Sequence, residues 1–169
     1  SNAPDWFFDA IKIEPQECEI ENVKGNLSYS KWQCESKNKN LLILIHGTGA
    51  HKKWWYPIAP QFTKNTNVIA VDLPGMGDSG FREKYSIKDF GQCIISIIEK
   101  EKSDMLIDNV SIVGHSLGGQ VAGYVASEKK ELVSNLIMID TFIRPPDWDP
   151  DQHEGCLLYT SPSPRDPWK

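Results

Sequence analysis

The sequence has no apolar run long enough to cross a membrane and no run of basic residues. Its longest uninterrupted apolar run spans residues 41–45, whereas a transmembrane helix needs about 20 residues. We therefore expect no membrane association. The formal net charge is −5, and a chain without a basic patch is not expected to bind nucleic acid. The N-terminus also lacks the basic and apolar segments of a secretory signal, so we expect a cytoplasmic protein.

Cysteine is scarce as well. The 4 cysteines are scattered without paired spacing, at Cys18, Cys34, Cys93 and Cys156. A disulfide framework or a zinc site would show cysteines at regular, closely paired spacings. We therefore expect free thiols, no bound metal and no cofactor.

The remaining composition is that of an ordinary globular protein, with 40% hydrophobic and 24% charged residues in 169. This length favours one domain with a hydrophobic core. Partial alternation predicts an antiparallel strand pair over about 11–21 and 26–34. Continuous apolar runs at 41–45, 68–71 and 136–139 predict buried strands, and a further strand precedes residue 114. Helical patterns occupy 51–62, where prolines interrupt the pattern, 86–98 and 121–126. We therefore predict an α/β fold, a mostly parallel sheet of about six strands with flanking helices.

One stretch dominates the chain. A short apolar strand ends in the sequence Gly-His-Ser-Leu-Gly at residues 114–118, and a helical pattern of small residues follows. The pattern G-x-S-x-G between a strand and a helix is a nucleophile elbow, in which a tight turn presents the serine at the end of the sheet. Side chains at Gly114 and Gly118 would collide with neighbouring backbone. We therefore predict Ser116 as a catalytic nucleophile.

Three motifs in this order resemble the α/β-hydrolase fold family. They are His-Gly-Thr-Gly at 46–49, Asp-Leu-Pro-Gly-Met-Gly-Asp-Ser at 72–79 and the elbow at 114–118. The resemblance extends over about residues 11–142. It implies that the chain forms the N-terminal part of that fold, with its first six strands and first three main helices.

The resemblance also implies roles around the serine. The backbone N–H of Thr48, together with that of Leu117 at the start of the following helix, is expected to form the oxyanion hole. Loop-shaping roles are expected for His46, Gly47, Gly49, Gly114, His115 and Gly118. His46 is thus expected to be structural and not the general base, and residues 72–79 are expected to be a structural turn.

A serine at the elbow separates this chain from related epoxide hydrolases and haloalkane dehalogenases, which use an aspartate there. Ser116 favours a small-molecule acyl substrate: a carboxylic ester, lactone or thioester, or a diketone cleaved between carbons. Trp54, Trp55 and Tyr56 either line an apolar acyl pocket or belong to the core of the first helix.

The catalytic partners of the serine are harder to find. In this fold the chain order is serine, acid, histidine. Asp140 as acid and His153 as base satisfy the order, but only a loop rich in Pro and Asp separates them. The family takes its histidine from after an eighth strand, and the sequence shows neither a seventh nor an eighth. We therefore expect the acid and the histidine of a full enzyme to be missing.

The two ends of the chain do not resemble a folded protein. Residues 1–3 match the scar of a cleaved expression tag, and residues 156–169 resemble the translation of a sequencing adapter. The alternative is a natural tail rich in Ser and Pro. We interpret 4–155 as a partial hydrolase domain, truncated in a gene fragment, for which environmental DNA is one possible source. Truncation would leave the strand at 136–139 as an open edge, through which we expect a homodimer or strand exchange.

These observations predict serine-nucleophile hydrolysis of an acyl substrate, with little or no turnover by the chain as it stands. Two alternatives remain open. One is a complete, short hydrolase that uses His153, and the other is a hydrolase-like binding module without chemistry.

Overall fold

The computed structural model describes residues 2–22, 25–36 and 38–143. Three sequence predictions lie outside the described residues: the base His153, the free thiol of Cys156 and the adapter-derived segment 156–169. Within the described residues, no helix is both long and apolar enough to pass through a bilayer. Cys18 and Cys34 are free thiols, as predicted, and Cys93 is buried.

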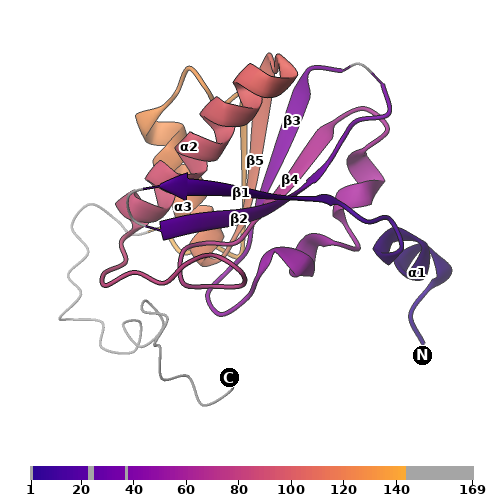
Figure 1. Cartoon of the computed structure of the whole chain (residues 1–169), viewed down its shortest axis with the longest axis horizontal. Coiled ribbons are helices and arrows are strands. Elements are labelled where there is room, and N and C mark those ends of the chain that lie inside the picture. The colour runs from indigo at the N-terminus through magenta and orange to yellow at the C-terminus, as the bar shows by residue number, and fades with distance from the viewer. Residues whose placement is uncertain (1, 23–24, 37, 144–169) are drawn as a thin grey trace.

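A single six-stranded sheet organises the molecule (Figure 1), in the spatial order β1-β2-β4-β3-β5-β6. Its strands are β1 (Gln16–Asn22), β2 (Gly25–Trp32), β3 (Asn40–Ile45), β4 (Asn67–Val71), β5 (Asn109–His115) and β6 (Asn135–Ile139). The pairs β1–β2 and β2–β4 are antiparallel, whereas β4–β3, β3–β5 and β5–β6 are parallel. The helices are α1 (Asp5–Ile11), α2 (Ile87–Met105) and α3 (Leu117–Glu128), with 3₁₀ turns η1 (Lys52–Trp55) and η2 (Ala59–Phe62). The predicted α/β class and the mostly parallel sheet are confirmed.

The two faces of the sheet are covered differently. Along β3, Ile43 and Ile45 belong to the larger core cluster with α2 and α3, while Leu42 and Leu44 belong to a smaller cluster with η1 and η2. Alternate residues of a strand point to opposite faces, so a continuous apolar run is needed where both faces are covered. Figure 1 shows α2 and α3 together on one side of the sheet.

Helix α2 begins and carries its apolar face as the sequence predicts. The hydroxyl of Ser86, the N-cap, accepts a hydrogen bond from the Asp89 N–H at 3.0 Å. This bond satisfies one of the N–H groups that a helix start leaves without a partner. Phe90, Ile94, Ile97 and Ile98 are all buried against the sheet.

Two predictions about the N-terminal half of the chain are wrong. Residues 51–62 form two short 3₁₀ turns and not an α-helix, because Pro57 and Pro60 cannot donate the N–H bonds of a continuous helix. The expected first strand does not start near Ile11, which ends α1; the strand starts at Gln16, just after Pro15. Helix α1 has only 7 residues, too few for a clear helical period.

The prediction that residues 136–139 form a buried strand is also corrected. Leu136, Ile137 and Ile139 are 38%, 53% and 44% exposed. Strand β6 pairs with β5 along one edge, and no described residue pairs with its other edge. An apolar sequence normally predicts burial, but here α3 covers only part of the strand, at Met138.

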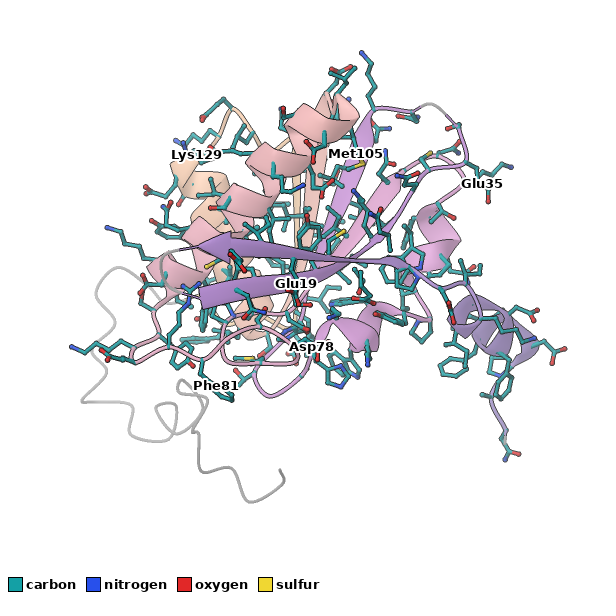
Figure 2. The ribbon with its side chains drawn as sticks, viewed as in Figure 1. Glu19, Glu35, Asp78, Phe81, Met105 and Lys129 are labelled. Carbon is teal, nitrogen blue, oxygen red and sulfur yellow. The ribbon has the colours of Figure 1, made fainter. Side chains whose placement is uncertain are left out.

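The parallel strands direct four loops to one end of the sheet. The segments after β3, β4, β5 and β6 all leave from the carboxyl ends of these parallel strands, which lie at the same end of the sheet. Met105 and Lys129, labelled in Figure 2, mark the carboxyl ends of α2 and α3, at the opposite end of the sheet. Asp78, on the loop after β4, lies toward the end of the sheet where the candidate site forms.

Candidate active site

Ser116 occupies the turn between β5 and α3, and its backbone conformation is unusual. Its φ of 53° and ψ of −117° lie where residues other than glycine are rarely found. The turn is held from both sides. The Ser116 N–H donates to the Ile139 carbonyl at 2.9 Å, and the Ser116 carbonyl accepts from the Gly119 N–H at 3.0 Å. This is the geometry of a nucleophile elbow.

The glycines of the motif lie where side chains do not fit. A Cβ on Gly114 would overlap the carbonyl of Gly118, at the start of α3. A Cβ on Gly118 would overlap the carbonyls of Ile45 and His46, at the end of β3. The first turn of α3 therefore packs directly on the backbone of two strands.

The loop after β3 passes beside the elbow. Gly47 is buried, and a Cβ on it would lie 3.0 Å from His115 Nδ1 and 3.2 Å from Ser116 Cβ. The Ala50 N–H closes the loop by donating to the Gly47 carbonyl at 3.2 Å. Thr48 is exposed at the tip of this turn and faces the same pocket as Ser116.

Leu117 is the first residue of α3. The N–H groups of a helix's first turn have no acceptor within the helix, and the helix dipole places partial positive charge there. The Leu117 N–H thus lies where developing negative charge beside Ser116 would be stabilised.

His46 is fully buried, and both of its ring nitrogens have partners. Nε2 accepts the Leu73 N–H at 3.1 Å, so Nδ1 carries the proton and donates to the Gly47 carbonyl at 2.7 Å. Burial lowers the pKa of His46 below its ordinary value of 6.5, which favours the neutral ring. The imidazole joins the loop after β3 to the loop after β4.

A pocket of about 510 Å³ opens in front of Ser116. Its walls come from two loops and the elbow: Gly47, Thr48, Gly49, Ala50, His51, Trp54, His115 and Ser116. The volume suits a small organic ligand.

The sequence left open whether the aromatic residues 54–56 line a pocket or belong to the core. The structure divides them between these two environments. Trp54 lines the pocket and is 56% exposed. Trp55 is buried in the smaller core cluster. Tyr56 packs edge-on against Trp32, with ring centroids 5.1 Å apart, and its hydroxyl donates to Glu17 at 2.6 Å. Only Trp54 of the three belongs to the pocket.

Two histidines line the pocket. His115 packs edge-on against Trp54, and its Nδ1 is buried without a hydrogen-bond partner among the described residues. The sequence motifs do not single out His51 as a residue of the pocket. Its position between a glycine-rich loop and the aromatic stretch was the available signal. Within the described residues, no hydrogen bond joins either ring to the Ser116 hydroxyl.

Asp140 directly follows β6, and its φ is 48°. Its neighbour Ile139 accepts the Ser116 N–H, so the segment is tied to the elbow through the backbone. The Asp140 carboxylate itself is exposed, with no hydrogen bond or ion pair within the part of the chain that is described. His153, the only histidine after Ser116, lies outside the described residues.

The loop 72–79 is built around a buried carboxylate. Asp72 accepts the Lys52 N–H at 2.6 Å through Oδ1 and the Asp78 N–H at 2.9 Å through Oδ2. Lys52 also places its ammonium 3.1 Å from Asp72 Oδ2. No local sequence pattern predicts a buried lysine at this point. Among the described residues (2–22, 25–36 and 38–143), no cluster of His, Cys, Asp and Glu is arranged to hold a metal ion.

The chain is similar to proteins of several named activities. The pimeloyl-[acyl-carrier protein] methyl ester esterase of Pseudoalteromonas atlantica is 33% identical over 111 residues, which cover 63% of this chain and 40% of that enzyme. The soluble epoxide hydrolase of a Corynebacterium species is 32% identical over 104 residues, 59% of this chain and 34% of the relative. The chain thus spans well under half the length of these relatives.

Solved structures of other proteins share the fold of this chain. A bacterial membrane phospholipase A matches with a TM-score of 0.67 and 27% identity, over 80% of this chain and 42% of that one. A thioesterase domain from the curacin biosynthetic pathway matches with a TM-score of 0.67 over 86% of this chain and 53% of its own, at 24% identity. The model of the alpha/beta hydrolase fold family matches residues 40–155. With the strand order and the elbow already described, this match shows that the chain belongs to the alpha/beta hydrolase fold family.

Proposed function

We propose that this chain carries the nucleophile of a serine hydrolase that acts on a carboxylic ester or a related acyl substrate. The observation that carries the proposal is the backbone of Ser116, held at φ 53° between β5 and α3 on the wall of the pocket. A strained residue persists only where the surrounding structure enforces it, and such residues cluster at functional sites.

The proposed reaction begins with attack of Ser116 Oγ on the carbonyl carbon of the substrate, while the hydroxyl proton passes to a base. The carbonyl oxygen becomes an oxyanion, for which the N–H groups of Thr48 and Leu117 are the proposed donors. Collapse of the intermediate expels the alcohol, which takes up a proton and leaves an acyl group on Ser116. Water then hydrolyses this acyl-enzyme and restores the hydroxyl.

His46 is not the base in this proposal. Its Nε2 already accepts the Leu73 N–H, its Nδ1 donates to the Gly47 carbonyl, and its ring has no exposed surface. The proposed base and acid are His153 and Asp140, or else residues of a longer enzyme. If they belong to a longer enzyme, we expect weak turnover by this chain, because an oxyanion hole without a positioned base retains only residual catalysis. If His153 serves as the base, the chain is a complete, short hydrolase.

The choice of an acyl substrate rests on the serine. One relative is an esterase of a methyl ester and another is an epoxide hydrolase. Epoxide opening in related enzymes uses a carboxylate at the elbow, whereas a serine hydroxyl suits attack on an acyl carbon. The backbone N–H groups beside Ser116 suit the oxyanion that acyl transfer forms.

The test is covalent labelling with a fluorophosphonate, together with hydrolysis of p-nitrophenyl acetate and butyrate. We expect slow labelling of the parent at Ser116, because the oxyanion hole retains residual catalysis, and no labelling of Ser116→Ala. Absence of labelling in the folded parent would overturn the proposal in favour of a non-catalytic binding module. Turnover that disappears in both Ser116→Ala and His153→Ala would identify a complete, short hydrolase that uses His153.

We also propose that the chain self-associates through β6. One edge of this strand is unpaired within the described residues, and its side chains carry no charge. Unpaired apolar edges favour pairing with another chain. Light scattering is expected to show a dimer that Ile137→Lys dissociates, and a monodisperse parent monomer would contradict this.

A further inference from the structure

Lys52, the first residue of η1, is a buried lysine with an unusually large set of partners. It is 1% exposed. Its Nζ donates to Ser28 Oγ and Asp78 Oδ2, both at 2.7 Å, and lies 3.1 Å from Asp72 and 3.4 Å from Glu17. Lysine is almost never fully buried without paired charges, because its ammonium is costly to remove from water. These contacts join η1 to β1, β2 and the loop after β4.

Among these partners, Asp72 depends most on Lys52. The Asp72 side chain is 1% exposed, whereas those of Asp78 and Glu17 are 63% and 55% exposed. Water can solvate the two exposed carboxylates if Lys52 is lost. A buried carboxylate has no such alternative, so its charge would remain without a counter-ion.

Asp72 in turn holds the main chain of the loop beside the elbow. It accepts the Lys52 N–H at 2.6 Å, which fixes the end of the loop. The start of the loop is fixed by His46, whose Nε2 accepts the N–H of Leu73, the next residue after Asp72. Both ends of the loop 47–51 are therefore attached to one short segment after β4. All five residues between these anchors line the pocket in front of Ser116.

We propose that Lys52 is a positioning residue for the pocket: its ammonium neutralises Asp72 and so keeps the loop 47–51, with the Thr48 N–H, in place beside Ser116. The inference rests on the proposed function, because Thr48 is the proposed oxyanion donor. Lys52 touches no substrate atom in this scheme and acts through Asp72 alone.

The direction of protonation agrees with this role. Burial opposes the charged ammonium, but the hydrogen bond to Asp78 and the charge of Asp72 outweigh it and raise the pKa of Lys52. The hydrogen bond and charge of Lys52 lower the pKa of Asp78. Lys52 and Asp78 are therefore both charged at neutral pH.

The first test is hydrogen–deuterium exchange of Lys52→Met against Lys53→Met, which removes the same charge from the exposed neighbouring position. We expect Lys52→Met to speed exchange of residues 46–54 and 72–79 at least tenfold, while β3 and β5 exchange as in the parent. Local opening of this kind is separable from global unfolding, which would accelerate the slowest amides of the sheet as well. Unchanged loop exchange, or an equal acceleration everywhere, would overturn the proposal.

The second test is rescue by Lys52→Met/Asp72→Asn. Asparagine keeps an acceptor for the residue 52 N–H and removes the buried charge, so the double variant is expected to fold and to recover most of the loop protection. A double variant whose loop is as exposed as that of Lys52→Met would contradict a role through the Asp72 charge.

The third test asks whether the position of the loop affects the reactivity of Ser116, measured as its rate of fluorophosphonate labelling. We expect Lys52→Met to lower the maximal rate of fluorophosphonate labelling by about tenfold or more with little change in the half-saturating concentration, because a small displacement of a donor costs rate and not binding. If the parent is not labelled, the proposed function fails, and the exchange experiment still decides whether Lys52 holds the loop.

Discussion

The indole of Trp54 meets the imidazole of His115 edge-on beside Ser116, with ring centroids 5.0 Å apart and planes at 61°. Despite this contact, Trp54 is 56% exposed. A large exposed aromatic ring on a pocket wall is typical of a surface that binds apolar groups.

We therefore predict that Trp54 selects for longer acyl or alkyl chains. Trp54→Ala should lower the ratio of long-chain to short-chain fluorophosphonate labelling rates by about tenfold, the usual effect of losing a hydrophobic contact. Trp6→Ala is the matched control, since Trp6 is 50% exposed on α1 and does not line the pocket. An unchanged chain-length ratio in Trp54→Ala would refute the prediction.

Two glycines of the site, Gly118 in the elbow and Gly49 in the loop after β3, allow a contrast between steric clash and backbone strain. Gly118→Ala would place a methyl group on the carbonyls of Ile45 and His46, and should destabilise the fold by several kcal/mol or prevent folding. Gly49→Ala has open space around it but a φ of +70°, so only backbone strain of about 1–2 kcal/mol is expected. Urea denaturation of both variants tests this, and equal losses would argue against close packing of α3 on β3.

His46 should make stability depend on pH. Burial holds its folded pKa below the ordinary 6.5, so the unfolded chain binds a proton that the folded chain does not. Stability is therefore fully present above pH 6.5 and is lost as the pH falls from there through the lowered pKa. The slope should approach about 1.4 kcal/mol per pH unit.

Urea denaturation between about pH 7 and about pH 5 measures this slope. His46→Gln should lack it, whereas His51→Gln, at an exposed position, should keep it. The carboxylates Asp78 and Glu17 do not interfere, because their pKa values lie below 3.8 and 4.5. A slope that survives in His46→Gln would count against the neutral, buried imidazole.

A second buried charge joins β2 to α2. Glu101 has no exposed surface; it accepts the Tyr29 hydroxyl at 2.5 Å and lies 3.0 Å from Lys31 Nζ. Burial and the adjacent carboxylate raise the pKa of Tyr29, which keeps its hydroxyl as a donor. Removal of one member of such a pair leaves the other charge buried.

Lys31→Met should therefore reduce the free energy of unfolding by about 3 kcal/mol or more. Lys100→Met is the control. Lys100 also lies near Glu101, at 3.9 Å, but its side chain is 43% exposed, so a loss below about 1 kcal/mol is expected. Similar losses in the two variants would show that the burial of Glu101 matters little.

Local patterns predicted the parts of this protein that depend on local physics. The β3 and β4 strands follow from continuous apolar runs, and the α2 start follows from the Ser86 cap. The elbow follows from two glycines around a serine, because that spacing is required wherever a helix turns back onto a strand. The prolines at 57 and 60 interrupt the helical pattern over 51–62, and the folded chain forms two separate 3₁₀ turns there.

Tertiary structure alone decided which groups meet. Nothing local to Lys52 shows that Ser28, Asp78 and Asp72 surround it, since the chain brings them together only when β2, β4 and η1 pack. The same holds for the division between Trp54 and Trp55, adjacent residues of which one lines the pocket and the other enters the core. By itself the sequence determined the central strands β3 and β4, the Ser86 cap and the serine turn, because these depend on residues near one another in the chain. The pocket and its buried charges depend on contacts between distant segments, whose energies exist only in the folded sheet.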